Sequence, residues 1–405
     1  MQNWKKVFTI IWTGQFISLI TSSLVNFAIV IWLSLETGSA EVLAFAAIAA
    51  LLPQSVLGLF SGVLIDRWDR KITMILSDAF IALCTLGIVI LFYLGEAQLW
   101  YIYLLLAFRS IGSAFHMPAM QASIPLLAPE SQLLRIAGVN QAIQSVSNIA
   151  GPALAAVAIS VMDIEHVMLI DIIGAIVAII SLLFVYIPNP PQEEKTGKGI
   201  AHFFNEIKVG INVVTDNKGL AYLFLFSIIA TFCLMPVAIL FPLLTLQHFH
   251  GSTFQMGLIE VVWGAGMLAG GGLLGLLNVS VNKAILINMT YLVLGLSLAF
   301  SGMLPSTGFV LFVVLTTIGG IAASIYNASF TTIIQEQVKP AMLGRVFSMF
   351  FSISILPSLL GLLGAGTLAE EVGISETFII LGSLIAIVGL VACFVPSLIK
   401  LGLKK

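Results

Sequence analysis

Five charged residues separate two long apolar segments in the stretch Gly62-Val63-Leu64-Ile65-Asp66-Arg67-Trp68-Asp69-Arg70-Lys71. The segments on either side, 42–65 and 72–94, are each long enough to cross the hydrocarbon core of a bilayer, which takes about 20 apolar residues. The stretch therefore predicts a short charged turn between two membrane-spanning helices. Gly62 allows close helix packing, and Asp66 is placed to cap a helix end and to pair with an arginine.

The same alternation of apolar segments and short polar loops continues along all 405 residues. The chain is 59% hydrophobic and only 9% charged, whereas a soluble domain carries about 25% charged residues. This composition predicts an all-α membrane protein. Twelve transmembrane helices are expected at 7–35, 42–65, 72–94, 99–120, 137–160, 166–187, 219–246, 254–277, 282–303, 308–334, 346–368 and 375–398.

Positive charge falls on one side of this arrangement. Of the 17 Lys and Arg residues, all except Arg109 lie on the side of the N-terminus, and Arg109 lies inside a span. The positive-inside rule then predicts a protein of the bacterial plasma membrane with both termini in the cytoplasm. The charged turn lies on the cytoplasmic face, where we expect a conformational latch formed by Gly62, Asp66, Arg67, Arg70 and Lys71. The alternative is that these charges only anchor the turn at the membrane surface.

One long polar stretch divides the spans into six plus six. Residues 188–218 begin with Pro188-Asn189-Pro190-Pro191 and continue into a segment with apolar residues on one face, which predicts an amphipathic helix at the cytoplasmic surface. Weak matches between glycines of the two halves, at similar intervals along the chain, indicate two parallel-repeat six-helix bundles. The predicted division is an N-terminal bundle over 1–187, a linker over 188–218 and a C-terminal bundle over 219–405.

Four charged side chains inside the spans are candidates for proton coupling or for balancing a buried charge: Asp78, Arg109, Asp171 and Glu260. A charge at mid-membrane is costly unless it is paired or hydrated. A carboxyl group in a low-dielectric site favours its neutral form, so it can load and release a proton or hold a cationic drug. Glu260 is the preferred candidate. The structural alternatives are an Arg109 held by carbonyl groups, acids that only support packing, and an Asp171 that reaches the interface.

Other spans carry packing signals and polar stripes. Gly151-Pro152 in the fifth span predicts a bend that lets two helices pack tightly, although an ordinary kinked helix is the alternative. The glycine-rich run 266–270 predicts another tight helix contact. Polar, aromatic and methionine side chains at helical spacing predict a lined cavity. His116 is better explained as an interior hydrogen-bonding residue than as a proton carrier. The cavity-lining candidates are Gln15, Ser22, Asn26, His116, Gln144, Asn148, Trp263 and Met267.

Several kinds of site are not indicated by the sequence. The cysteines Cys84, Cys233 and Cys393 lie far apart in apolar spans, which argues against disulfides and thiolate metal sites. The sequence contains no phosphate-binding loop for ATP, no HExxH motif and no nucleophile elbow. We therefore expect no enzymatic activity, no cofactor, no metal and no nucleic-acid partner.

The charged turn resembles the signature GxxxDRxGRK of the major facilitator superfamily, with Asp69 in place of the usual glycine. Gly151-Pro152 resembles the superfamily's antiporter motif gxxxGPxxGG. Arg109 corresponds to an arginine that superfamily antiporters carry in the fourth span, although Gly112 stands where those proteins have glutamine. Beyond these motifs, the chain resembles the macrolide efflux (Mef) branch of bacterial drug exporters at Trp12–Gln15, Ser18–Ser22, Arg109–His116, Asn217–Leu220, Gly266–Gly271 and Leu343–Ser348.

This resemblance implies the major facilitator fold and the efflux of macrolides or similar amphiphilic antibiotics. The implied mechanism is a proton-coupled antiport by alternating access, whose partners are the drug, the proton and the lipid bilayer. Two alternatives stay open. One is an exporter of an endogenous metabolite such as a siderophore, and the other is the membrane component of an efflux assembly that depends on an ATPase partner.

Overall fold

The computed structural model describes residues 4–65, 68–129, 132–188, 200–276, 282–339 and 342–402. Within these ranges the chain forms fourteen α-helices and no β-strand, which confirms the predicted all-α fold. Contacts divide the chain into two compact units. Unit 1 comprises Met1–Trp32 and Phe45–Gly199, and unit 2 comprises Leu33–Ala44 and Ile200–Lys405. The tip of the first helical hairpin therefore groups with unit 2.

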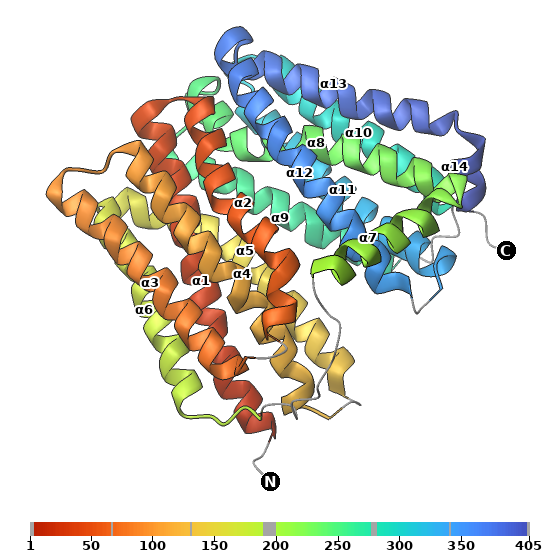
Figure 1. The fold of residues 1–405 in the computed structure, drawn as a ribbon. Helices are drawn as coiled ribbons and strands as arrows, with labels where there is room; N and C mark the ends of the chain where they lie inside the picture. Colours follow the sequence, from red (N-terminus) through yellow and green to blue (C-terminus); the bar gives the residue numbers. More distant parts are fainter. Residues whose placement is uncertain are drawn as a thin grey trace. The chain divides into compact units, whose positions relative to one another are not determined.

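Unit 1 has its helices packed around a core in which Ile11, Met74 and Leu182 are fully buried. In Figure 1, α3 runs beside α6, and contacts also join α3 to α4. The helices of unit 1 are α1 (Trp4–Thr37), α2 (Ala40–Ile65), α3 (Arg70–Leu94), α4 (Leu99–Leu127), α5 (Leu133–Val161) and α6 (Ile164–Leu183). The adjoining ends of α1 and α2, Leu33–Ala44, belong to unit 2.

The charged turn after α2 supplies the start of α3. Asp69 is the N-cap of α3 and accepts a hydrogen bond of 2.9 Å from the backbone N–H of Ile72, which satisfies one of the free donors at a helix start. Lys71 Nζ donates a hydrogen bond of 2.8 Å to the carbonyl oxygen of Val185, just beyond the end of α6. Asp66, the residue predicted to cap a helix here, lies outside the described residues.

Unit 2 is organised around an aromatic core in which Phe312 and Phe378 are fully buried and their rings lie near that of Phe241. Helices α10 and α13 lie side by side along much of their length (Figure 1). The helices are α7 (Ile200–Thr215), α8 (Lys218–Gln247), α9 (Thr253–Leu276), α10 (Lys283–Met303), α11 (Phe309–Gln337), α12 (Leu343–Val372), α13 (Ile374–Cys393) and α14 (Pro396–Leu401).

Eleven helical segments among the described residues are long and apolar enough to cross a membrane. Helix α4 is not one of them, because polar side chains such as Arg109 and His116 lower its average hydropathy. Large apolar side chains elsewhere point outward, with exposed fractions of 79% for Phe184 and 78% for Phe394. Such exposure suits contact with lipid rather than with water.

Candidate functional site

The strongest charge pairing inside unit 1 joins α4 to α6. Arg109 NH1 lies 2.6 Å from Asp171 Oδ2, and the two side chains are only 6% and 1% exposed. Two opposite charges at this distance offset much of the cost of burying either one alone. Asp171 is therefore an interior residue of the bundle and does not reach the surface.

Neutral side chains from two further helices complete the surroundings of this ion pair. Ser22 Oγ of α1 donates a hydrogen bond of 2.6 Å to Asp171 Oδ1. Thr85 of α3 accepts a hydrogen bond from Arg109, and its hydroxyl oxygen lies 2.9 Å from Asp171 Oδ2. Arg109 NH2 also donates to Asn26 Oδ1 of α1 at 3.2 Å. We call Ser22, Asn26, Thr85, Arg109 and Asp171 the arginine layer.

A second acid–base pair lies in the same unit. His116 Nε2 of α4 is 3.2 Å from Asp78 Oδ1 of α3, and both side chains are buried. Gln15 of α1, which is fully buried, donates a hydrogen bond of 3.4 Å to Asp78 Oδ2. Gln15 Oε1 has no hydrogen-bond partner among the described residues. We call Gln15, Asp78 and His116 the histidine layer.

The two layers are stacked because three helices repeat the same spacing. Gln15 and Ser22 on α1, Asp78 and Thr85 on α3, and Arg109 and His116 on α4 are each seven residues apart. Seven residues make about two turns of an α-helix, so each pair shares a face and is separated by roughly 10 Å along the axis. Packing of α3 against α4 then brings like levels together.

The two layers differ in what they can do chemically. Arginine side chains do not give up their proton in proteins, so the pair of Arg109 with Asp171 is not suited to carrying one. Histidine is the side chain that changes charge near neutral pH, and it can exchange a proton with a neighbouring carboxylate. The histidine layer is therefore the part of unit 1 that is suited to gaining and losing a proton.

Glu260, the preferred proton carrier from the sequence, lies on α9 in unit 2. It is half-buried, and no hydrogen bond or ion pair joins it to another described residue. Trp263, one turn further along, packs its ring near Phe241 at a centroid distance of 5.8 Å. Met267 is half-buried on the same helix. The structure thus gives Glu260 no charged or polar neighbour of the kind that surrounds Asp78 or Asp171.

The remaining predicted residues are distributed over unit 1. Pro152 lies inside α5, and the preceding Gly151 sits so close to Ser23 of α1 that a Cβ atom would meet the serine backbone at 2.9 Å. Gln144 is half-buried and Asn148 exposed on the same helix.

The latch residues lie around the charged turn. Gly62 is in α2, and Arg70 is buried at the start of α3 with its NH1 group 3.5 Å from the carbonyl oxygen of Trp68. Lys71 binds the end of α6 as described above. Asp66 and Arg67 lie outside the described residues, so the latch itself stays a prediction.

Thr85 is the functional candidate that sequence reasoning missed. A threonine in an apolar helix usually bonds back to its own chain, and Thr85 also lies 3.1 Å from the Ile81 carbonyl oxygen. The available signal was the spacing: Thr85 follows Asp78 at the same interval that separates Arg109 from His116. Gln15, Ser22 and Asn26, which were expected to line a cavity, contact the buried charges, and their place in a cavity stays a prediction.

The sequence of this chain is similar to those of known transport proteins. A sequence profile described as the Major Facilitator Superfamily matches residues 11–307 and 223–400. The chain is 39% identical over 402 residues to "Macrolide efflux protein A" of Streptococcus pyogenes, a match that covers 99% of each chain. It is 26% identical over 389 residues to "Multidrug efflux pump Tap" of Mycobacterium tuberculosis, covering 92% of this chain and 89% of that protein.

The fold has solved counterparts. The structure of the nucleoside transporter NupG matches with a TM-score of 0.68 and 14% sequence identity, covering 96% of this chain and 98% of that one. At this identity the match shows the fold alone. Together with the eleven candidate spans, these similarities describe a multi-pass membrane transporter with twelve-helix architecture.

Proposed function

The chain belongs to the major facilitator superfamily, and on that premise we propose that it exports macrolides or similar amphiphilic antibiotics from a bacterial cell in exchange for protons. The observation that carries the efflux proposal is the 39% identity to a macrolide efflux protein over 99% of both chains. Similarity to a multidrug efflux pump supports a range of amphiphilic substrates rather than a single compound.

The histidine layer supports the proton part of the proposal. Asp78 and His116 are buried at ion-pair distance, and a buried pair of this kind changes its interactions when one proton is added or removed. A proton entering the cell releases about 2.3 kcal/mol per 100 mV of membrane potential. For an uncharged drug exchanged one for one, that free energy supports a concentration ratio of about 50-fold, since about 1.4 kcal/mol corresponds to a factor of ten. Exchange of one proton for a drug with one positive charge moves no net charge and is driven by the pH difference alone.

We assign the arginine layer a structural role in this scheme. Arg109 and Asp171 hold α4 and α6 together through their ion pair, while Ser22 and Asn26 tie α1 to it. Glu260 remains a candidate for binding the cationic part of a drug or for a second proton, because a half-buried carboxylate without a partner can take either.

The experiment is the accumulation of radiolabelled erythromycin in pump-deficient bacteria that express the chain, with and without a protonophore. Proton-driven export predicts low accumulation that the protonophore raises to the level of cells with an empty vector. Low accumulation that survives the protonophore would instead support an ATPase-dependent assembly. Unchanged accumulation despite confirmed membrane insertion would reject macrolides as substrates, and competition with endogenous metabolites would then be measured.

Two variants separate the candidate proton carriers. Asp78→Asn is expected to abolish protonophore-sensitive export, because the histidine layer loses its carboxylate. Glu260→Gln is expected to weaken coupling or drug binding while membrane insertion stays intact. Proton-dependent export that is unchanged in Glu260→Gln would remove this residue from the mechanism, and unchanged export in Asp78→Asn would do the same for the histidine layer.

A further inference from the structure

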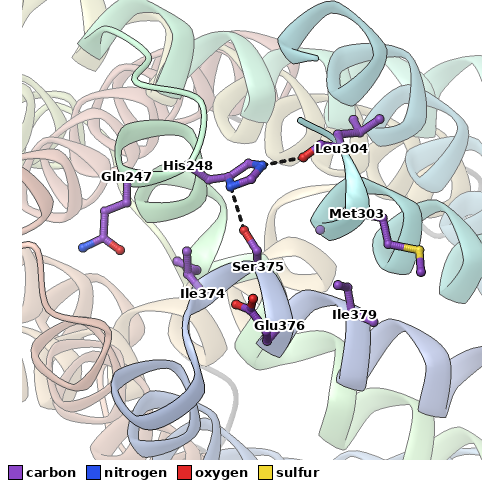
Figure 2. Close-up of a pocket in the computed structure, with 9 residues that line it drawn as sticks. Gln247, His248, Met303, Leu304, Ile374, Ser375, Glu376 and Ile379 are labelled. Carbon is purple, nitrogen blue, oxygen red and sulfur yellow. Dashed lines mark hydrogen bonds between the residues drawn. The ribbon is translucent and has the colours of Figure 1, made fainter. Parts of the chain in front are cut away.

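An open pocket of about 690 Å³ lies at one end of unit 2. The end of α8, the end of α10 and the first turn of α13 form its wall (Figure 2). His248 joins these three ends. Its Nε2 lies 2.7 Å from the carbonyl oxygen of Leu304, and its Nδ1 lies 2.8 Å from Ser375 Oγ.

These two hydrogen bonds define the state of the His248 ring. A carbonyl oxygen only accepts, so Nε2 carries a proton and donates to Leu304. In the neutral ring, Nδ1 then accepts from the hydroxyl of Ser375. Both nitrogens are occupied, and Figure 2 shows the ring held between its two partners. His248 therefore links the helix ends that form the pocket, and neither of its ring nitrogens is free to bind a ligand.

The carboxylate of Glu376 is the group that is open to a ligand. It lines the pocket, its side chain is exposed, and it has no hydrogen bond or ion pair with any residue that the structure describes. Glu376 belongs to the first turn of α13. Its Oε2 occupies the space beside Gly373, 2.5 Å from where a Cβ atom would stand.

The other polar side chains of the lining, Gln247, His248 and Ser375, already hold hydrogen bonds, and apolar side chains supply the remaining contact surface. Met303 is 62% exposed, and Leu304 and Ile379 lie beside it in the lining. No Lys or Arg occurs among the described residues that line the pocket. One free carboxylate beside apolar side chains is complementary to an organic cation with an apolar body, and the flexible Met303 can adapt to different shapes.

We propose that this pocket binds amphiphilic organic cations, with Glu376 facing the cationic group and Met303 and Ile379 contacting the apolar body. The predicted orientation places this end of unit 2 outside the cell. The site is then one that an exported drug with a protonated amine meets on the outer side, an assignment that rests on the proposed function. Cation binding itself does not depend on transport.

The test measures access to the pocket in purified protein reconstituted in lipid nanodiscs, where both faces are open to solvent. A Met303→Cys variant in a Cys393→Ser background provides one accessible thiol, because Cys84 and Cys233 are buried. The rate of its reaction with a hydrophilic maleimide is measured with tetraphenylphosphonium as the cationic probe and triphenylphosphine oxide as the neutral counterpart. We expect the cation, and not the neutral compound, to slow the reaction.

When Glu376→Gln is added, we expect that about fivefold more tetraphenylphosphonium is needed for the same protection. This factor corresponds to the free energy of an exposed charge pair. Glu371→Gln, an exposed acid at the end of α12 outside the lining, is the matched control and should leave the protection unchanged. Ile379→Ser supplies a second variant and should weaken protection by the cation, because an apolar contact is lost. Equal protection in Glu376→Gln, equal protection by the neutral compound, or an unreactive thiol would each overturn the proposal.

Erythromycin export is measured for the same variants, so that failure of the pocket proposal can be distinguished from failure of the transport proposal. Cation protection without any export would retain the pocket and reject the transport assignment. Export together with a failure of cation protection would reject the pocket alone.

Discussion

Arg109, Asp171 and Asp78 each have an acid–base partner beside them and a hydrogen bond with a neutral side chain of α1. Ser22 forms a hydrogen bond with Asp171, Asn26 with Arg109, and Gln15 with Asp78. Burial of a charge without such partners would cost several kcal/mol. The polar stripe of α1 therefore allows three other helices to carry charges at the centre of the bundle.

Replacing Asp171 with Asn is expected to destabilise unit 1, because the Arg109 guanidinium stays buried without a countercharge. Removing one partner from a buried ion pair costs about 3–5 kcal/mol. Thermal unfolding of the purified protein in detergent measures this loss. The control is Glu336→Gln, which breaks an exposed pair with Lys283 and should cost at most about 1 kcal/mol. Equal effects of the two variants would contradict the assigned role of Asp171.

Thr85→Val keeps the shape of the side chain and removes the hydroxyl between Arg109 and Asp171. We expect a loss of about 1–3 kcal/mol, because buried polar atoms are left with fewer partners. Thr367→Val is the matched control, since that exposed hydroxyl bonds only to carbonyl groups of its own helix. Thermal unfolding compares the two. A Thr85 variant as stable as the Thr367 variant would show that the hydroxyl is dispensable.

At the scale of elements, a seven-residue repeat turns separate helices into stacked layers. On α3, Asp78 and Thr85 share a face, and on α4, Arg109 and His116 share another. Helix geometry places members of each pair about two turns apart. The packing of α3 against α4 aligns the levels, so the arrangement needs no unusual backbone conformation.

Close packing of α9 against α11 depends on glycines on one face of α9. A Cβ atom at Gly266 would collide with the carbonyl oxygen of Thr317, and one at Gly270 would lie 2.6 Å from the carbonyl oxygen of Ile321. At Gly272, on the same helix, a Cβ atom would meet nothing within 4 Å. The tight contact predicted for the run 266–270 is thus confirmed.

These glycines give a matched pair of substitutions. Gly266→Ala is expected to lower the unfolding temperature, because the contact atoms are backbone and cannot turn aside; the cost of overpacking is about 1–3 kcal/mol. Gly272→Ala should be neutral or stabilising, since alanine favours helix by about 1 kcal/mol over glycine. Thermal unfolding in detergent gives both values. A Gly272 variant that is less stable than the Gly266 variant would contradict the packing described for α9 and α11.

At the scale of the whole molecule, charge sidedness predicts the orientation in the membrane. Lys and Arg residues lie in the connections on the side of the N-terminus, and those on the other side carry acids and histidines. Positive charges near the ends of spans stay in the cytoplasm. Alkaline phosphatase, which is active only outside the cytoplasm, should be active when fused after Glu96 and inactive when fused after Lys405. The reverse result would overturn the predicted topology.

Some properties of this protein follow from local sequence alone. Hydropathy and loop charge depend only on the residues of each segment, so the helical class and the order of the spans were predictable. The close contact at 266–270 was predictable from its glycines. The charged turn was predictable as a helix start. Asp69 caps the start of α3, and the cap predicted at Asp66 lies outside the described residues.

The partners of the buried charges were decided by tertiary structure. Arg109 and Asp171 are separated by 62 residues in the sequence, and Ser22 and Asp171 by 149. Hydropathy indicates which helices cross the membrane and leaves open which helices become neighbours. A charge at mid-membrane must find its countercharge on whichever helix packs beside it, so packing of α1, α3, α4 and α6 selects the pairs. The sequence determined that buried charges exist, and only the assembled bundle determined how each is balanced.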